Sequence, residues 1–204
     1  MKKLARISAL AISVLAALSP ASLAQEASFY SGKTITLLVP SAAGGGYDTY
    51  ARTLARHYPK HIPGRPTIIV QNVPAGGGMV AANNLFNLSP RDGTAIGMLA
   101  SSSLLVAALG ERLAKFDNQK FTPIGNMSEE SDTCSVWHTS GVADARDFLI
   151  KEVVIGSEGV GSNSHTFPLG MNEVLGAKLK IVPGYRGTQL RFAAMERGDA
   201  GEGR

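Results

Sequence analysis

One stretch of sequence decides the fold class of this 204-residue chain: Thr34-Ile35-Thr36-Leu37-Leu38-Val39-Pro40-Ser41-Ala42-Ala43-Gly44-Gly45-Gly46-Tyr47-Asp48. Its first part is an apolar, β-branched run typical of a strand buried in a parallel sheet, and Pro40 closes the strand. The glycines permit a tight turn. Asp48 is a good N-cap for a helix whose apolar residues recur at helical spacing as far as Tyr58. A strand, a glycine turn and a helix in this order predict one β-α unit of an α/β protein.

The same order returns twice in the next sixty or so residues. Thr67 to Val70 forms a second strand, and Gly76-Gly77-Gly78 leads into an amphipathic helix that ends near Leu88. Ala95 to Leu99 forms a third strand, and the serines from Ser101 to Ser103 offer N-caps for a short helix through Leu109. This alternation predicts a parallel sheet with helices on its faces.

The pattern changes after Gly110, and a second α/β unit begins. Residues 121–137 read as two strands with a polar turn between Ser128 and Asp132. The remaining elements are a short helix at 144–149, strands at 153–155 and 178–182, a helix with Pro168 inside it or near its start, and a last helix at 189–197. We therefore expect a first lobe over residues 25–120 and a partial second lobe over 121–204. Two parallel strands leave apolar surface uncovered, so the sequence predicts a truncated chain with an incomplete second lobe.

The N-terminus has the three parts of a secretion signal. Lys2, Lys3 and Arg6 form a basic start, residues 10–18 are an apolar core, and Ser22-Leu23-Ala24 is a small-residue cleavage site. Residues 1–24 are thus expected to be a signal peptide cleaved near Ala24, with an uncleaved anchor as the alternative. The signal carries three basic and no acidic residues, so the net charge of the rest is +1 rather than +4. Without a basic stripe, nucleic acid is not an expected partner.

Three glycine-rich turns, each after an apolar run and each opening a helix, carry the functional information. Free N–H groups at a helix start point at whatever lies above the turn, and the helix dipole favours an anion there. The Gly44 turn lacks the Gly-Lys-Ser/Thr ending of a phosphate loop and does not match the dinucleotide fingerprint. The sequence therefore indicates a small anion held through backbone groups, with tight turns that bind no ligand as the alternative.

Catalytic and metal-ligating patterns are weak in this sequence. Gly159-Val160-Gly161-Ser162 does not have the spacing of a nucleophile elbow, and Ser162 is better placed as an N-cap whose hydroxyl could also touch a ligand. His165 either faces a cleft or packs within its helix. Cys134 reads as a small buried residue of a strand. The four histidines form no recognised ligand set, so we expect no metal, no cofactor and no enzymatic activity.

Together these motifs resemble one protein family. Lys33 to Pro40 followed by Gly44 to Asp48 resembles the mature N-terminus of the substrate-binding proteins of tripartite tricarboxylate transporters, the Bug receptors of the bacterial periplasm. The segments 71–78, 90–94 and 159–165 are similar to the family's second loop, its Pro-x-Asp-Gly turn and its third loop. Tyr185-Arg186-Gly187 and residues 194–198 resemble segments near the helix of its second lobe. Family members continue for roughly another hundred residues, which this chain does not contain.

The resemblance implies a two-lobed, type II-like periplasmic-binding-protein architecture with a carboxylate held in the cleft by loop backbone and water. It implies a periplasmic location, transfer of the ligand to membrane permease subunits, and a monomer. The candidate ligand-binding residues from the turns and from the resemblance are Ser41, Ala42, Ala43, Gly44, Gly45, Asp48, Gly76, Gly77, Ser101, Ser102, Glu158, Gly159, Val160, Gly161, Ser162 and His165. Two alternatives stay open, a small α/β enzyme acting on a phosphorylated or carboxylate substrate and a non-functional truncated receptor.

Overall fold

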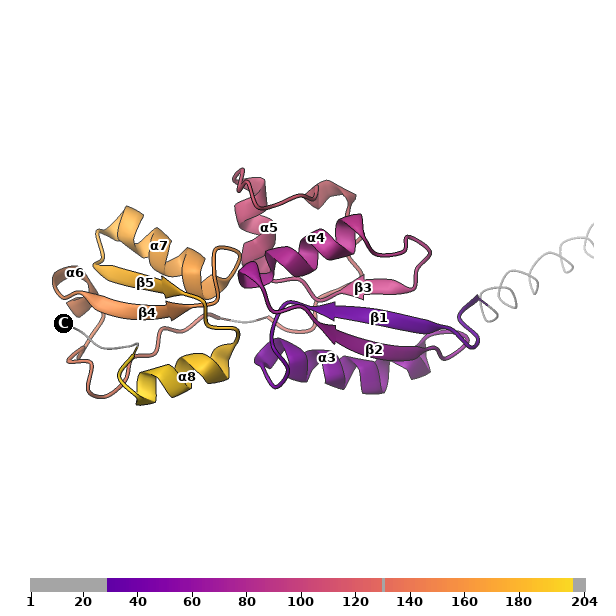
Figure 1. Cartoon of the computed structure of the whole chain (residues 1–204), viewed down its shortest axis with the longest axis horizontal. Coiled ribbons are helices and arrows are strands. Elements are labelled where there is room, and N and C mark those ends of the chain that lie inside the picture. The colour runs from indigo at the N-terminus through magenta and orange to yellow at the C-terminus, as the bar shows by residue number, and fades with distance from the viewer. Residues whose placement is uncertain (1–28, 130, 200–204) are drawn as a thin grey trace, which may run out of the picture.

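The computed structural model describes residues 29–129 and 131–199, which form two parallel sheets with flanking helices (Figure 1). The expected signal peptide lies outside the described residues. All strands of the three-stranded sheet fall within residues 25–120, and both strands of the other sheet fall within 121–204. The position of the lobe boundary stays a prediction.

The first sheet has the order β2-β1-β3, as expected for successive β-α units. Strand β1 (Thr34–Val39) pairs in parallel with β2 (Thr67–Asn72) on one side and with β3 (Ala95–Gly97) on the other. Its register places Leu37 opposite Val70 and Ile96. The central strand is almost wholly buried because helices cover both faces of the sheet (Figure 1).

The helices of this part of the chain, labelled in Figure 1, are α3 (Gly46–His57), α4 (Met79–Asn87) and α5 (Ser101–Ala108). Two 3-10 turns accompany them, η1 (Tyr58–His61) after α3 and η2 (Gly76–Gly78) before α4. Helix α3 begins three residues earlier than the sequence suggested, and its N-cap is Gly45 rather than Asp48. Asp48 instead lies in the first turn. The serines at the start of α5 are also not its N-cap, because that position belongs to Ala100.

The second sheet contains β4 (Val153–Ser157) and β5 (Leu179–Pro183), paired in parallel with Val153 opposite Leu179. Helix α7 (Asn163–Leu175) lies on one face and α8 (Thr188–Glu196) on the other, while the short α6 (Asp147–Ile150) precedes β4 (Figure 1). Helix α7 begins at Asn163 and accommodates Pro168 in its interior. Gly176 closes it in the left-handed conformation that glycine adopts most easily.

The two strands expected within residues 121–137 are wrong. The described residues of this segment form neither a strand nor a helix, and Cys134 is exposed. The nearest regular element is the 3-10 turn η3 (Asn118–Lys120) just before it. The apolar alternation was real, but a strand also needs a neighbouring strand to bond, and here the chain crosses from one sheet to the other.

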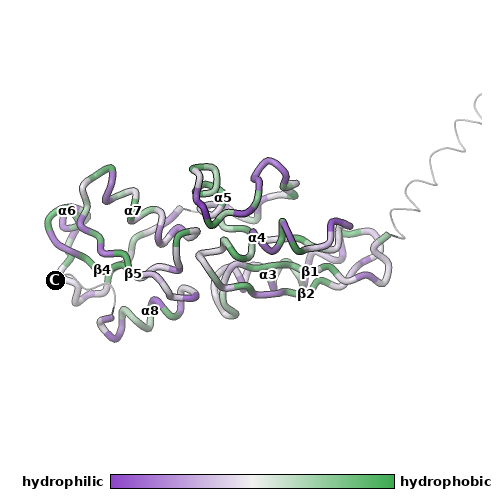
Figure 2. The backbone as a smooth tube through the Cα atoms, turned by 45° about the horizontal axis from the view of Figure 1, so that its top comes forward, coloured by the Kyte–Doolittle hydropathy of each residue, from purple (hydrophilic) through white to green (hydrophobic). Residues whose placement is uncertain are grey.

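Each sheet has its own apolar core, and Figure 2 shows hydrophobic stretches along the strands of both. Ile35, Leu37 and Val39 pack with Ala51 and Ile68 in the first. The second contains Phe148, Val153, Ala177 and Leu179. In the part of the chain that the structure describes, no helix combines the length and the apolar character of a membrane span.

Candidate ligand-binding cavity

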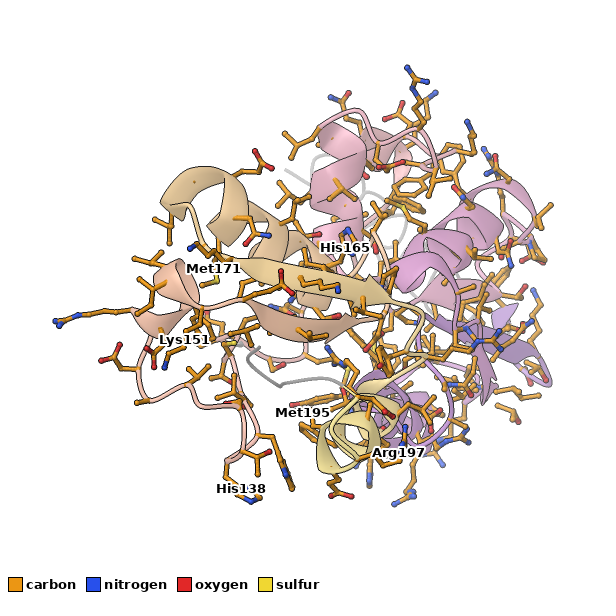
Figure 3. The ribbon with its side chains drawn as sticks, turned by 60° about the vertical axis from the view of Figure 1, so that its left-hand side comes forward. His138, Lys151, His165, Met171, Met195 and Arg197 are labelled. Carbon is orange, nitrogen blue, oxygen red and sulfur yellow. The ribbon has the colours of Figure 1, made fainter. Side chains whose placement is uncertain are left out.

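A cavity of about 740 Å³ lies between the two sheets, at the carboxyl ends of β1 and β4. This is where ligands bind in open α/β sheets. It extends along β4 between α7 and α8, from which Met171 and Met195 approach it on opposite faces of the second sheet (Figure 3). The polar and glycine residues of its wall are Ser41, Gly45, Gly46, Tyr47, Tyr50, Gly77, Asp132, Thr133, Ser135, Gly156, Glu158, Ser162, Asn163, Ser164, Gly187, Thr188 and Arg191.

The first glycine turn is held from behind by Asp48. The Asp48 carboxylate accepts hydrogen bonds from the Gly44 N–H (2.8 Å), from Arg52 Nε (2.8 Å) and from Asn72 Nδ2 (2.9 Å). The side chain is 4% exposed, and the Arg52 hydrogen bond is the main cause that lowers the pKa of Asp48 to about 2. Asn72 also donates to the Ser41 carbonyl. This network fixes the loop and leaves the start of α3 facing the cavity.

The second glycine turn packs directly on the third. A Cβ atom at Gly77 would lie 2.5 Å from both the Gly159 carbonyl and the Ser162 N–H. Gly77 also has a φ of +61°, which disfavours any other residue. These glycines therefore bring two backbones together, a role that the sequence did not suggest, and Gly77 also lines the cavity.

Two serines at the start of α5 hold this junction. Ser102 Oγ donates to the Gly161 carbonyl at 2.8 Å, and Ser103 Oγ lies 2.8 Å from the same carbonyl and 3.2 Å from that of Gly77. Both side chains are buried. The start of α5 thus binds the loops of both sheets through two serines that do not line the cavity.

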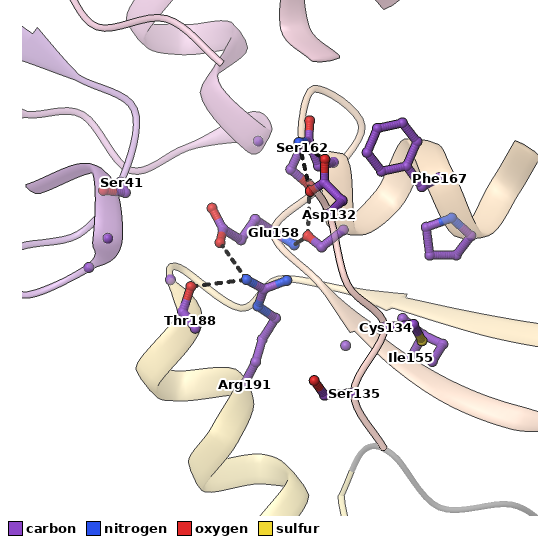
Figure 4. A pocket seen from close by; sticks show the side chains of 18 of the residues that line it. Ser41, Asp132, Cys134, Ser135, Ile155, Glu158, Ser162, Phe167, Thr188 and Arg191 are labelled. Carbon is purple, nitrogen blue, oxygen red and sulfur yellow. Dashed lines mark hydrogen bonds and ion pairs between the residues drawn. The ribbon is translucent and has the colours of Figure 1, made fainter. Parts of the chain in front are cut away.

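A partly buried ion pair lies in the wall beyond the third loop. Glu158 Oε1 lies 3.2 Å from Nη2 of Arg191, and the side chains are 16% and 23% exposed (Figure 4). The same nitrogen donates to Thr188 Oγ1 at 3.1 Å. Burial raises the pKa of Glu158, although the Arg191 charge opposes the change.

Polar contacts also fix the start of α7. Ser162, its N-cap as expected, donates through Oγ to the Gly159 carbonyl at 2.7 Å and lies 3.0 Å from Ser164 Oγ. Asn163 Nδ2 donates to both carboxylate oxygens of Asp132. His165 Nδ1 lies 3.1 Å from Ser157 Oγ, a contact within the second sheet and its helix.

The cavity includes some of the candidate residues and not others. Ser41, Gly45, Gly77, Glu158 and Ser162 line it. Eleven candidates do not belong to the wall: Ala42, Ala43, Gly44, Asp48, Gly76, Ser101, Ser102, Gly159, Val160, Gly161 and His165. Most of these support the wall from behind, and their contacts with a ligand stay a prediction.

Sequence reasoning missed the contributions of α8 and of the crossing segment. Thr188, Arg191 and Phe192 line the cavity from α8, and residues 132–135 line it beside β4. Arg191 could have been suspected as a cation on a predicted helix, but nothing in the sequence pairs it with Glu158. In residues 29–129 and 131–199 no group of three or more His, Cys, Asp or Glu side chains could hold a metal ion.

The two sheets also meet on the other side of the cavity. The Ala42 N–H donates to the Arg186 carbonyl at 3.2 Å, and Gln189 Nε2 donates to the Gly44 carbonyl. With the junction of the second and third loops, these bonds connect the loops of the two sheets at two places.

Several solved structures share this fold. Among solved structures, a periplasmic transporter has a TM-score of 0.71 at 23% identity, and Rpa4515 of R. palustris with adipate has 0.70 at 22%. A TctC solute binding protein from Polaromonas has a TM-score of 0.53 at 25% identity, and the periplasmic binding protein BugD and malate-bound MatC also match. The chain has the fold of the TctC and Bug periplasmic binding proteins. The expected fold class and the resemblance are confirmed, and these neighbours are binding proteins rather than enzymes.

A curated relative supports the same assignment. The UPF0065 protein in the TAR-I ttuE-ttuC' intergenic region of Agrobacterium vitis is 29% identical over 170 residues. No known protein-family profile matches the sequence. The chain spans about half of that relative's length (48%). It spans 59%, 57% and 59% of the length of the first three structures. The matches to these structures cover 84%, 82% and 84% of this chain.

Proposed function

We propose that this chain is a periplasmic receptor of the tripartite tricarboxylate transporter type, which captures a small carboxylate and delivers it to membrane permease subunits. In this proposal residues 1–24 are the signal peptide, the two lobes divide near residue 120, and the receptor acts as a monomer. The single observation that carries the proposal is the cavity between the sheets, where the starts of α3 and α7 both reach the wall through Gly46 and Asn163. The N–H groups and dipole of a helix start favour a carboxylate.

The fold comparison agrees with this chemistry, since two of the neighbours contain adipate and malate. The cavity volume also lies within the range of small-molecule sites. The test is a thermal melt of the purified protein, alone and with di- and tricarboxylates, amino acids and aromatic acids. A compound that binds the native state must raise the midpoint. A panel without any stabilising carboxylate would contradict the proposal, and consumption of the ligand would favour the enzyme alternative.

A substitution of Gly46 tests whether the carboxylate binds at the start of α3. It lines the cavity as the first residue of α3, and a Cβ atom there would meet nothing within 4 Å. Gly46→Leu should therefore fill the space above the helix start without disturbing the loop. Gly45 is a poorer choice, because its Cβ would lie 3.1 Å from the Ala42 carbonyl.

We expect Gly46→Leu to weaken carboxylate binding by roughly tenfold or more while stability changes by only about 0.5 kcal/mol. Isothermal titration calorimetry measures the first quantity and denaturant unfolding the second. Gly125→Leu is the matched control, since Gly125 is exposed, outside the cavity, and also has open space around it. Unchanged affinity in Gly46→Leu would place the site elsewhere.

A further inference from the structure

The two walls of the cavity differ in charge. The lining residues of the first sheet and α3 are uncharged, and this wall offers the start of α3. Among the described residues, the charged side chains of the lining are Asp132, Glu158 and Arg191, all from the second wall. One cation and two carboxylates leave that wall with an excess of negative charge.

Glu158 has acceptor capacity that the protein does not use. Only Oε1 has a charged partner, the Arg191 guanidinium at 3.2 Å, and within the described residues Oε2 accepts no hydrogen bond. A carboxylate has about four acceptor positions. Figure 4 shows the second oxygen pointing away from Arg191, toward the side of the cavity on which Ser41 lies. A bound group that donates hydrogen bonds would satisfy this oxygen.

The cation of this wall, Arg191, is already paired within the protein. Its Nη2 is shared between Glu158 and Thr188. Its Nε is inaccessible to solvent and has no partner among the described residues. An anion at this wall would lie beside the Glu158 carboxylate and would compete with it for the guanidinium, which weakens a partly buried ion pair.

We propose that the ligand is a carboxylate with a protonated amine at its far end, the amine bound by Glu158 and the carboxylate at the start of α3. This inference rests on the proposed function, because it assumes that the cavity holds a carboxylate. A dicarboxylate of the same length would place its second charge against Glu158, and like charges repel strongly at a poorly solvated site. The chain would then differ in selectivity from the adipate- and malate-bound neighbours.

Three pairs of probes test the inference, each pair differing only in an ammonium that replaces one carboxylate. They are succinate and β-alanine, glutarate and γ-aminobutyrate, and adipate and δ-aminovalerate. Calorimetry on the wild-type protein should give at least roughly tenfold tighter binding for the amino member of the pair that fits the cavity. Glu158→Gln should remove that preference by weakening the amino member and strengthening the dicarboxylate.

Glu173→Gln is the matched control, since it makes the same charge change at an exposed residue of α7 outside the cavity. Arg191→Met separates the roles of the two partners. It should keep or strengthen binding of the amino probe, whereas loss of all binding in a variant that still melts cooperatively would make Arg191 the carboxylate ligand.

The outcomes distinguish this inference from the proposed function. If neither these probes nor any other carboxylate stabilises the wild-type protein, the proposed function fails. If dicarboxylates bind as tightly as their amino partners or more tightly, or if only carboxylates without an amine bind, the receptor stands and the assignment to Glu158 is overturned.

Discussion

Asp48 and Glu158 are two carboxylates beside glycine turns at the ends of parallel strands, yet their surroundings are opposite. Asp48 accepts hydrogen bonds from Gly44, Arg52 and Asn72, and the pKa of its carboxyl falls to about 2. Glu158 has one charged partner, and burial raises its pKa. The Asp48 carboxylate has all its hydrogen-bond partners within the protein and supports a loop, whereas the Glu158 carboxylate has one oxygen without a protein partner among the described residues.

This difference shows that similar glycine turns have different structural roles in the two lobes. In the first lobe, the carboxylate makes the glycine turn rigid, so that the start of α3 is in place before a ligand arrives. In the second, the loop is shaped by contact with the opposite lobe through Gly77, and its charged residue remains open to the cavity. Three substitutions break or sharpen this comparison.

The largest effect is expected from Gly77→Ala, which separates the second loop from the third. The new Cβ would lie 2.5 Å from two backbone atoms, and the residue would keep a positive φ. Backbone cannot move aside as a flexible side chain does, so we expect a loss of about 3 kcal/mol or more in the free energy of unfolding. Urea unfolding followed by circular dichroism measures it.

Gly44→Ala is the control for this substitution, because Gly44 also has a positive φ (+82°) but open space around its Cβ. Gly44→Ala should lower the free energy of unfolding by only about 1 to 2 kcal/mol, which is the cost of holding an alanine in the left-handed conformation. Equal losses in the two variants would mean that contact between the loops contributes nothing.

Asp48→Asn should have the next largest effect, a loss of about 2 kcal/mol at neutral pH. The pKa of Asp48 falls from 3.8 to about 2 on folding, so its contribution is complete above pH 3.8 and is lost as the pH falls through about 2. The stability difference between wild type and Asp48→Asn should therefore vanish in acid. Melts between neutral pH and about pH 2 would show it. A stability loss in Asp48→Asn that does not change with pH, or an equal pH dependence in Glu173→Gln, would mean that the ionisation of Asp48 is not its cause.

Glu158→Gln should have the smallest effect on stability and the opposite dependence on pH. Because burial raises the pKa of Glu158, its contribution is present below the unfolded pKa and is lost as the pH rises through the raised value. The stability of wild type relative to Glu158→Gln should decline from acid to neutral pH, by under about 1 kcal/mol because Arg191 opposes the shift. Melts of both proteins across this range measure it, and a rise instead of a decline would mean that Glu158 is stabilised as Asp48 is.

Much of the fold could be predicted from the sequence because its signals are local. The strands at Thr34, Thr67, Val153 and Leu179 and the helices after the glycine turns follow from apolar periodicity and turn chemistry. The predictions failed where contacts with other parts of the chain determine the local structure. The segment at 121–137 alternates like a strand but has no strand beside it, and Asp48 looks like an N-cap but bonds back to Gly44 from the first turn.

The sequence by itself determined the three glycine turns and, outside residues 121–137, the alternation of strands and helices, since each depends on residues a few positions apart. The parallel pairing followed from that alternation. Only the tertiary structure decided that Gly77 packs against the third loop, that Ser102 and Ser103 hold that junction, and that Arg191 pairs with Glu158 in the cavity wall. These contacts join segments distant in the chain, and only the packing of the two sheets brings them together.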